Sequence, residues 1–285
     1  MANNPWLQRR VIAYAHQGGA HEGPSSCLGT IAEALRIGAT AIELDVHMTK
    51  DGHLMVCHDE TVDRTTQRSG AIANLTLEEL KALDNAYWWA PGEAASPGLP
   101  DDAYPLRGRA PKDHEYQIAT LREVLERFPD TVLNMDIKQT APEVVSYEQP
   151  LADLLREYDR AESVIVSSFS DDAVNRFRAI APEFMTGSAT GEVAAFYFAV
   201  QAGEVPPATP SVALQVPETF DDLVVVDQKF VDIAHEQGLA VHVWTINDTP
   251  SMERLLNLGV DGLISDVPTE MVHTIEAHGL TWRGY

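Results

Sequence analysis

Six titratable side chains lie close together in residues 41–66, at the ends of what read as two apolar strands. Carboxylates grouped with imidazoles are side chains from which proteins build metal sites and acid–base catalysts. Because a β-strand has a period of two, Glu43 and Asp45 lie on one face of a strand predicted over 40–46. The six side chains are Glu43, Asp45, His47, His53, His58 and Asp59.

A tight turn would bring these side chains together. Residues 50–52 read Lys-Asp-Gly, which is typical of a three-residue hairpin turn with glycine in the left-handed position. Thr49 then faces His53, so that paired residue numbers sum to 102 and His58 comes level with Leu44. The hairpin therefore places His58 beside both carboxylates, whereas His53 is predicted to be a solvated residue near the tip.

A third carboxylate and a lysine are predicted at the end of a later strand. Asp136 and Lys138 are two residues apart and share one face of that strand. Three carboxylates facing one another across one cleft raise each other's pKa unless a cation lies between them, and hard oxygen ligands suit Mg²⁺ or Ca²⁺. The alternative is that Glu43, Asp45 and Asp136 are unrelated or ion-paired acids. Lys138 either supplies positive charge to an anionic substrate or pairs with one of these carboxylates.

His16 and His58 are the histidines predicted at strand ends near the carboxylates. Two imidazoles beside a bound phosphate can act as general base and general acid near neutral pH, and a structural role is the alternative for each. His47, two residues beyond Asp45, either points into the same site or lies at the hairpin edge. Trp244, at the end of another apolar strand, either walls a pocket or belongs to the core.

The elements that must position these residues alternate between short apolar runs and helical patterns. Eight such repeats predict a parallel (β/α)8 TIM barrel, in which active sites lie at the carboxyl ends of the strands. An open, doubly wound sheet is the alternative, but no G-x-G-x-x-G sequence follows a strand. The predicted strands span 11–16, 40–46, 131–137, 163–168, 184–188, 212–216, 240–245 and 261–265, with a ninth at 54–58, and helices are predicted at 27–37, 143–157, 171–180, 228–237 and 251–258.

Residues 63–117 fit no strand–helix unit, so we predict a small inserted subdomain within one domain that spans 1–285. Thr76 and Glu79 form a capping-box pattern that predicts a short helix over 76–86, and residues 120–123 predict a second helix start of the same kind. Residues 90–111 are rich in proline and glycine, which predicts a loop that leaves the chain near the site and covers the barrel mouth.

The net charge of −23, from 20 Lys and Arg against 43 Asp and Glu, argues against nucleic acid and anionic membranes as partners. An anionic substrate would therefore need local positive charge. No apolar run approaches about 18 residues, so no membrane span is expected. The first residues show no signal-peptide pattern, and two cysteines do not make a disulfide framework, so we expect a cytoplasmic location.

Four blocks of the sequence resemble the glycerophosphodiester phosphodiesterase family and together span nearly the whole chain. They are AHQGG at 15–19, GATAIELDVHMTKDGHLMVCHDETVDRTT at 38–66, LNMDIK at 133–138 and VWTINDTPSMERLLNLGVDGLISDVP at 243–268. The resemblance implies a (β/α)8 barrel that hydrolyses glycerophosphodiesters to glycerol 3-phosphate and an alcohol. It also implies a divalent metal held by Glu43, Asp45 and Asp136, with His16 and His58 as the acid–base pair.

Three departures from the family pattern bear on the substrate. Gln17 stands where the family has an arginine that contacts phosphate, so this substrate-binding position lacks one positive charge. Residues 24–30 read PSSCLGT in place of the usual P-E-N-T. Asp136 stands where the family has a glutamate, and the aspartate side chain is the shorter of the two. Related lysophospholipases of D type share the same blocks, so the choice of substrate stays open.

The first hypothesis is a metal-dependent phosphodiesterase acting on a small molecule, with Mg²⁺ or Ca²⁺ as cofactor and with Lys138, Gln17 and Trp244 at the substrate site. The alternatives are a lysophospholipase D-type activity, a non-catalytic barrel that binds phosphodiesters, and another barrel hydrolase or lyase that uses the same metal. The sequence does not indicate an oligomeric state.

Overall fold

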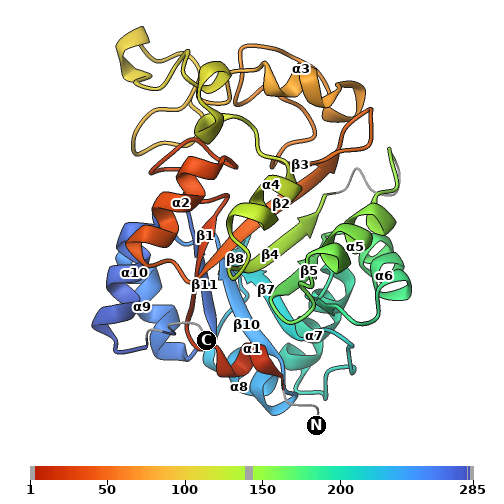
Figure 1. The fold of residues 1–285 in the computed structure, drawn as a ribbon. Helices are drawn as coiled ribbons and strands as arrows, with labels where there is room; N and C mark the ends of the chain where they lie inside the picture. The colour runs from red at the N-terminus through yellow and green to blue at the C-terminus, as the bar shows by residue number, and fades with distance from the viewer. Residues whose placement is uncertain (1–3, 139–143, 281, 283–285) are drawn as a thin grey trace.

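The structure is a computed structural model that describes residues 4–138, 144–280 and 282. Eight parallel strands form the centre of the molecule, and most of the helices lie around them (Figure 1). Each strand lies within one or two residues of its prediction, as expected for short apolar runs bounded by polar turns. The strands are β1 (Ile12–His16), β2 (Ala41–Met48), β4 (Val132–Ile137), β5 (Val164–Ser167), β6 (Met185–Thr186), β7 (Ala213–Pro217), β10 (Ala240–Trp244) and β11 (Gly262–Ser265).

The sheet closes on itself. The order β6-β5-β4-β2-β1-β11-β10-β7 places β1 between the second and the last barrel strands. The two ends of this series meet through a parallel bridge between Gly187 and Ala213, and the Ser188 amide donates to the Ala213 carbonyl at 2.9 Å. The predicted (β/α)8 barrel is therefore confirmed, and the open doubly wound sheet is wrong.

The amino end of the barrel is filled by side chains. The short helix α1 (Pro5–Gln8) buries Trp6 completely, among residues from the beginnings of the strands such as Ile12, Ala41 and Val132. Asn4 holds this helix in place through hydrogen bonds from its side-chain amide to the Val212 and Gly238 carbonyls. Any deep cavity in this barrel must therefore open at the carboxyl end of the strands.

The helices outside the barrel begin and end where local chemistry allows. Helix α9 starts at Thr249, two residues before the prediction, because the Asp248 side chain accepts from the Ser251 amide and Pro250 suits the first turn. The predicted start of α5 at 143 lies outside the described residues.

No helix in the described parts of the chain is both long and apolar enough to cross a membrane. The helices are α2 (Leu28–Ile37), α4 (Leu121–Arg127), α5 (Glu148–Glu157), α6 (Asp171–Ile180), α7 (Thr190–Ala202), α8 (Gln228–Glu236), α9 (Thr249–Leu258) and α10 (Pro268–Ala277).

The hairpin between β2 and β3 (Leu54–Val56) has the predicted register. Val46 pairs with Val56 and Met48 with Leu54, so that paired numbers sum to 102. The Thr49 amide donates to the His53 carbonyl at 2.9 Å, which closes the turn. His53 is exposed, as predicted for the tip.

Residues 63–117 lie at one end of the barrel, beside β3 and above α2 in Figure 1. They contain one short α-helix, α3 (Leu77–Lys81), and several single 3₁₀ turns. The predicted capping box of Thr76 and Glu79 is confirmed, but the helix ends five residues before the predicted end. Leu80, Leu83 and Ile72 form a small core of their own with Met55 and Cys57 of the hairpin.

The proline- and glycine-rich stretch 90–111 is held down more firmly than its composition indicates. Tyr104 is buried, and the Arg107 guanidinium lies 3.9 Å from the centre of its ring and 4.3 Å from that of Tyr87. The same guanidinium donates to the Tyr87 carbonyl at 2.9 Å. Such stacking is worth about 0.5–2 kcal/mol, so one cation fixes a segment that has few apolar residues.

Glu123 ties α4 to α3 and gives a prediction for stability. Its carboxylate accepts from Lys81 Nζ at 2.6 Å and from the Thr120 amide at 2.7 Å. Burial by itself raises the pKa of Glu123, but these bonds and His114 outweigh it and lower the pKa to about 2. The folded pKa lies below the unfolded one, so this stabilisation is complete above about pH 4.5 and is lost as pH falls through about 2.

Glu123→Gln is therefore expected to lower the free energy of unfolding by about 1–3 kcal/mol at pH 7, measured by urea denaturation. The difference between wild type and variant should shrink steadily between pH 4.5 and 2. Glu126→Gln, on the exposed face of the same helix, is the control and should change stability by less than about 0.5 kcal/mol. A difference for Glu123→Gln that stays constant with pH would show that the carboxylate charge contributes nothing.

Candidate active site

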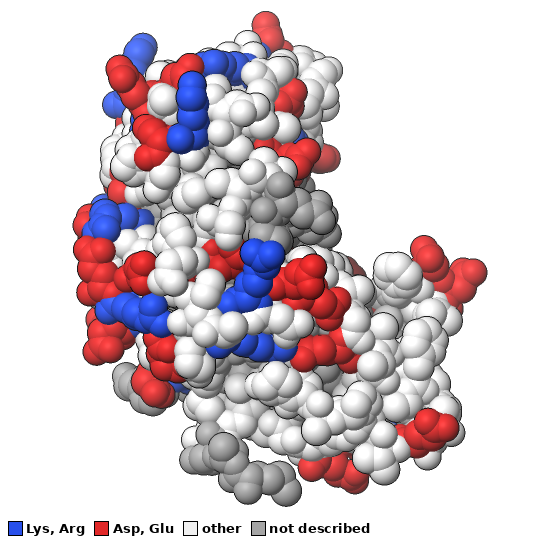
Figure 2. All heavy atoms as spheres, turned by 90° about the vertical axis from the view of Figure 1, so that its right-hand side faces the viewer, with Lys and Arg blue, Asp and Glu red and all other residues white. Residues whose placement is uncertain are grey.

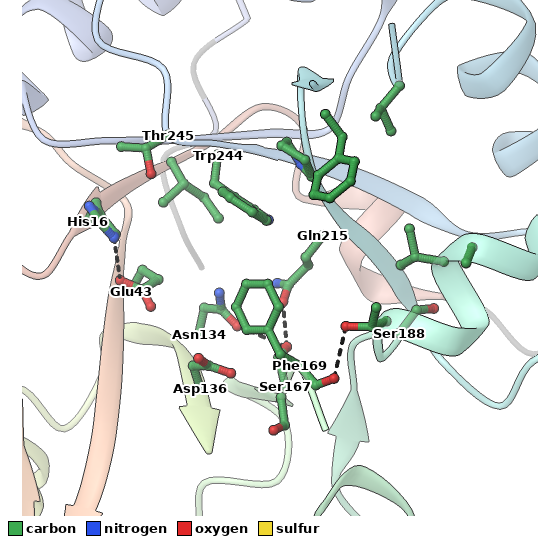
Figure 3. Close-up of a pocket in the computed structure, with 18 of the residues that line it drawn as sticks. His16, Glu43, Asn134, Asp136, Ser167, Phe169, Ser188, Gln215, Trp244 and Thr245 are labelled. Carbon is green, nitrogen blue, oxygen red and sulfur yellow. Dashed lines mark hydrogen bonds and ion pairs between the residues drawn. The ribbon is translucent and has the colours of Figure 1, made fainter. Parts of the chain in front are cut away.

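A cavity of about 490 Å³ opens at the carboxyl ends of the barrel strands. It contains seven of the eight predicted site residues, all except Gln17. Figure 3 shows His16 and Glu43 at one side of this cavity, Trp244 at its upper edge, and Asp136 and Phe169 below. The residues that line it are His16, Glu43, Asp45, His58, Asn134, Asp136, Lys138, Ser167, Ser168, Phe169, Ser188, Thr190, Val193, Ala194, Tyr197, Phe198, Gln215, Pro217, Phe220, Leu223, Val225, Trp244, Thr245 and Ile264.

The outer wall of the cavity differs from the sequence-based expectation. None of these lining residues comes from 63–117, the segment that was predicted to cover the barrel mouth. The wall is built instead by α7 and by a small hairpin of β8 (Thr219–Phe220) and β9 (Leu223–Val224). Neither element was assigned from the sequence.

His16 is the last residue of β1 and is held by a buried carboxylate. Its Nδ1 lies 2.6 Å from Asp266 Oδ1, and the Asn247 side-chain amide donates to Asp266 Oδ2 at 2.8 Å. Asp266 follows β11, which pairs with β1, so barrel closure brings the two ends together. Burial by itself lowers the pKa of His16, but the hydrogen bond to Asp266 and the charge of Glu43 outweigh it and raise the pKa to about 9.

His58 is held in a similar way by its sequence neighbour. Its Nδ1 lies 2.6 Å from Asp59 Oδ1, and Arg64 donates to both oxygens of Asp59 at 2.7 and 3.2 Å. Burial by itself raises the pKa of Asp59, but the bonds from His58 and Arg64 hold it well below its usual range. The His16 and His58 rings lie 6.4 Å apart between centroids and nearly perpendicular. Both rings can therefore reach one small group between them.

The three carboxylates lie on two neighbouring strands rather than across the barrel mouth from one another. Glu43 and Asp45 belong to β2, and Asp45 stands opposite Asp136 of β4 in the parallel register. Lys138 Nζ lies 3.1 Å from Asp45 Oδ1 and 3.3 Å from Asp136 Oδ2, so the ion-paired alternative for Lys138 is observed here. Burial raises the pKa of Glu43, and Asp45 raises it further. Burial also raises the pKa of Asp136, although Lys138 works against it.

The carboxylate oxygens of this site are the kind of ligand that a hard divalent cation prefers, but in this structure they are not grouped around one point. Asp45 Oδ2 is buried and accepts no hydrogen bond from any residue the structure describes, which leaves it available as a ligand. Among those residues, however, no three His, Cys, Asp or Glu side chains are already grouped as a metal-binding cluster. The Lys138 ammonium occupies the place between Asp45 and Asp136. A bound cation would therefore have to displace or accompany this ammonium.

The other predicted residues are placed as follows. Gln17 is buried outside the cavity, and its side-chain Nε2 lies 3.3 Å from His16 Nε2. Trp244 lines the cavity and meets the Phe169 ring edge-on at 5.7 Å, so the pocket-wall alternative describes it. His47 is buried outside the cavity, with Nε2 3.3 Å from the His58 carbonyl, and burial lowers its pKa to about 4.

The polar floor of the cavity includes residues that the sequence did not single out. Asn134 of β4 and Gln215 of β7 point inward beside the Ser167 hydroxyl, which contacts both side-chain amide oxygens. The period of two could have identified Asn134, because it is on the same face of its strand as Asp136. Gln215 carried no signal, since it stands alone in an apolar run.

A (β/α)8 barrel that holds two carboxylate-supported histidines and three acids in one cavity belongs to the class of barrel enzymes equipped for acid–base chemistry. The model of the glycerophosphoryl diester phosphodiesterase family matches residues 16–270. The chain belongs to this family, and it is a phosphoric diester hydrolase. The recognition made from the four sequence blocks is confirmed.

Individual relatives are similar to this chain over nearly its full length. The chain is 29% identical over 272 residues to a glycerophosphodiester phosphodiesterase of Caldanaerobacter subterraneus subsp. tengcongensis, with 95% of this chain and 100% of the relative covered. It is 24% identical to a human lysophospholipase D, covering 90% of this chain and 83% of the relative. A solved Oleispira antarctica phosphodiesterase in complex with sn-glycerol-3-phosphate has the same fold, with a TM-score of 0.70, 23% identity, and 95% and 99% of the two chains covered.

Proposed function

We propose that this protein hydrolyses glycerophosphodiesters to glycerol 3-phosphate and an alcohol, and that it does so with a bound divalent cation. The observation that carries the proposal is the meeting of His16 and His58 beside three buried carboxylates and Lys138 in one cavity. The family relatives named for this reaction and the neighbour solved with its product support it. A protein that only binds phosphodiesters has no need of two histidines that are each held by an aspartate.

The chain's own residues account for substrate binding and proton transfer. Lys138 is paired with Asp45 and Asp136, and its ammonium would still bring positive charge to the floor of the cavity when an anionic phosphate binds there, in a protein of net charge −23. One histidine takes a proton from the nucleophile, which is water or the neighbouring glycerol hydroxyl, and the other gives a proton to the oxygen that leaves phosphorus. Glu43, Asp45 and Asp136 would hold a Mg²⁺ or Ca²⁺ ion, which supplies Lewis-acid stabilisation of the phosphate oxygens.

The test is a panel of glycerophosphodiesters coupled to detection of glycerol 3-phosphate. Glycerophosphocholine, glycerophosphoethanolamine and glycerophosphoinositol share the reacting group and differ in the alcohol, so hydrolysis of any of them supports the reaction class. Binding of these compounds without turnover would favour the non-catalytic alternative. Turnover of phosphate-free esters with none of the panel would favour another hydrolase on the same barrel.

Asp266 is predicted to be a positioning residue for His16. Because Asp266 accepts the Nδ1 proton, the Nε2 atom of His16 faces Glu43 and the cavity. Asp266→Asn removes the acceptor that fixes this orientation, so kcat should fall by about 10²-fold or more with a smaller change in KM. Nitrogen NMR of His16 should show a change in the protonated ring nitrogen, which a purely structural role would not produce.

Asp261→Asn is the matched control, because Asp261 holds His235 at 2.7 Å through an equivalent pair outside the cavity. This variant should cost stability, since Asp261 is buried, but the folded fraction should keep its kcat. An unchanged kcat and an unchanged His16 tautomer in Asp266→Asn would contradict the role assigned to Asp266.

A further inference from the structure

A layer of uncharged polar side chains lies inside the barrel, below the carboxylates. Asn134 is two residues before Asp136 on β4, which places it about 6.6 Å deeper along the strand. Gln215 of β7 stands opposite His242 of β10 in the parallel register. Bulky branched residues dominate such interior layers in (β/α)8 barrels, so a polar layer needs a reason other than packing. We call the part that lines the cavity the uncharged floor: Asn134, Ser167, Ser188 and Gln215.

Two glycines leave room for this polar layer. A Cβ atom at Gly187 would lie 2.5 Å from Ser167 Oγ and 3.0 Å from Gln215 Oε1. A Cβ atom at Gly262 would lie 2.9 Å from the His242 ring. Any larger residue at either position would displace the polar side chains. The backbone of the barrel is therefore fitted to these side chains.

His242 holds the side-chain amide of Gln215 in one orientation. Gln215 Nε2 and the Tyr14 hydroxyl lie 3.4 and 3.5 Å from His242 Nδ1. Burial lowers the pKa of His242 to about 4, so the ring is neutral near pH 7 and Nδ1 is the acceptor for these donors. Because its nitrogen is turned to His242, Gln215 directs Oε1 to the Ser167 hydroxyl, which donates to it.

This arrangement leaves hydrogen-bonding groups open to the cavity. Ser167 has one hydroxyl hydrogen, and because Gln215 accepts it, Asn134 Oδ1 at 3.4 Å can accept from a ligand. Figure 3 shows the Asn134 amide nitrogen turned toward the open centre of the cavity. Ser188 is 6% exposed, and its hydroxyl has no partner in the parts of the chain that the structure describes. Buried polar groups without partners are costly, so they indicate a ligand that supplies the missing bonds.

A neutral hydroxyl is the ligand group that matches the uncharged floor. Side-chain amides and serine hydroxyls both donate and accept hydrogen bonds, as an alcohol does. Charged groups lie elsewhere, at the strand ends around Lys138 and in the acidic side chains that border uncharged areas of the face drawn in Figure 2. Choline and ethanolamine headgroups are cationic, whereas glycerol is uncharged. The three carbons of a glycerol whose phosphate binds at Lys138 are long enough to bring its outer hydroxyl down to the uncharged floor.

We propose that the uncharged floor binds the outer hydroxyl of the substrate's glycerol, that Gln215 determines specificity for this hydroxyl, and that His242 is the positioning residue for Gln215. The proposal rests on the proposed phosphodiesterase activity and names the residues that select the alcohol part of its substrate. An analogue without the hydroxyl would leave the buried polar groups of the floor unpaired, so the site should reject it.

The test compares kcat/KM, measured by choline release, for glycerophosphocholine and for 2-hydroxypropyl phosphocholine. The second compound lacks only the outer hydroxyl and keeps the one next to the phosphate. The wild type should favour glycerophosphocholine by about 10- to 10³-fold. Gln215→Met removes the amide and keeps the length of the side chain, so it should reduce this preference to within about threefold by losing rate on glycerophosphocholine alone.

Gln237→Met is the matched control, because Gln237 is a half-buried glutamine that donates to the Pro206 carbonyl outside the cavity. It should keep the wild-type preference. Equal kcat/KM for both substrates in the wild type, or a preference that survives Gln215→Met, would overturn the inference and leave the proposed function standing. An equal fall on both substrates in Gln215→Met would show a structural role and also reject the inference. No hydrolysis of any glycerophosphodiester would overturn the inference and the proposed function together.

Two substitutions separate positioning by His242 from packing. His242→Asn keeps an acceptor close to the place of Nδ1 but leaves a void, whereas His242→Leu fills the space without an acceptor. If His242 positions Gln215, the asparagine variant should keep the preference for glycerophosphocholine and the leucine variant should lose it. The reverse order, equal effects in both variants, or a variant that does not fold would assign the ring to packing and reject its positioning role.

Discussion

Replacing either His16 or His58 by alanine is expected to lower kcat on glycerophosphocholine by about 10²–10⁴-fold, the usual size of a general acid–base contribution. Each imidazole points into the cavity from a fixed position, because Asp266 and Asp59 hold their Nδ1 atoms at 2.6 Å. The carboxylates that would bind the cation are untouched, so calorimetric binding of Mg²⁺ or Ca²⁺ should survive in both variants. His53→Ala is the matched control, since His53 lies exposed on the same hairpin as His58.

A substrate with a better leaving group separates the two roles. With a p-nitrophenyl ester the leaving oxygen needs no proton, so the variant that lacks the general acid should recover much of its rate. The variant that lacks the base should not recover, because the nucleophile still has to lose its proton. Near wild-type rates for both variants on glycerophosphocholine would show that the histidines are structural.

The barrel and the hairpin were predictable because they follow from periods and local turn chemistry. The strand ends depend on apolar runs, and the pairing of Val46 with Val56 follows from a three-residue turn at 50–52. The capping boxes of Thr76 and Thr120 are likewise local signals, and both are confirmed. Each of these features involves residues close together in the sequence, so no knowledge of the closed barrel was needed.

Helix α7 and the β8–β9 hairpin were missed for opposite reasons. The sequence TGEVAAFYFAVQA over Thr190–Ala202 is apolar on almost every side, so it lacks the polar face that identifies an amphipathic helix. The strands Thr219–Phe220 and Leu223–Val224 have two residues each, too few to show a period, and their apolar side chains face solvent. Residues of both elements line the cavity, so its outer wall could not be assigned from the sequence.

The side chains that hold His16 and His58 could be predicted only in part. Asp59 is adjacent to His58 in the sequence, but nothing local indicates that Arg64 binds its carboxylate through both oxygens. Asp266 and His16 are 250 positions apart and meet because β11 closes against β1. A strand-end position identifies such residues as candidates, whereas their pairing depends on the register of the closed barrel.

Excess chelator is expected to abolish hydrolysis of glycerophosphocholine, and Mg²⁺ or Ca²⁺, rather than a thiophilic metal such as Cd²⁺, should restore it. Glu43, Asp45 and Asp136 are all buried, and the pKa values of Glu43 and Asp136 are raised because burial and mutual repulsion disfavour three charges in one place. Lys138 supplies one positive charge, which cannot offset three carboxylates and a phosphodiester together. A divalent ion held by oxygen ligands would make up this difference.

A binding measurement tests the ligand set without relying on activity. Isothermal titration calorimetry of Mg²⁺ and Ca²⁺ should show one site in the wild type and a loss of affinity of at least about tenfold in Glu43→Gln and in Asp136→Asn. Asp172→Asn, an exposed carboxylate on α6, is the control and should bind as wild type does. Lys138→Met should bind the cation at least as tightly as wild type, because the ammonium between Asp45 and Asp136 competes for their oxygens. Full activity in excess chelator, or equal affinity in all four variants, would show that no functional cation binds at this site. Lys138 would then be the positive charge with which these carboxylates pair.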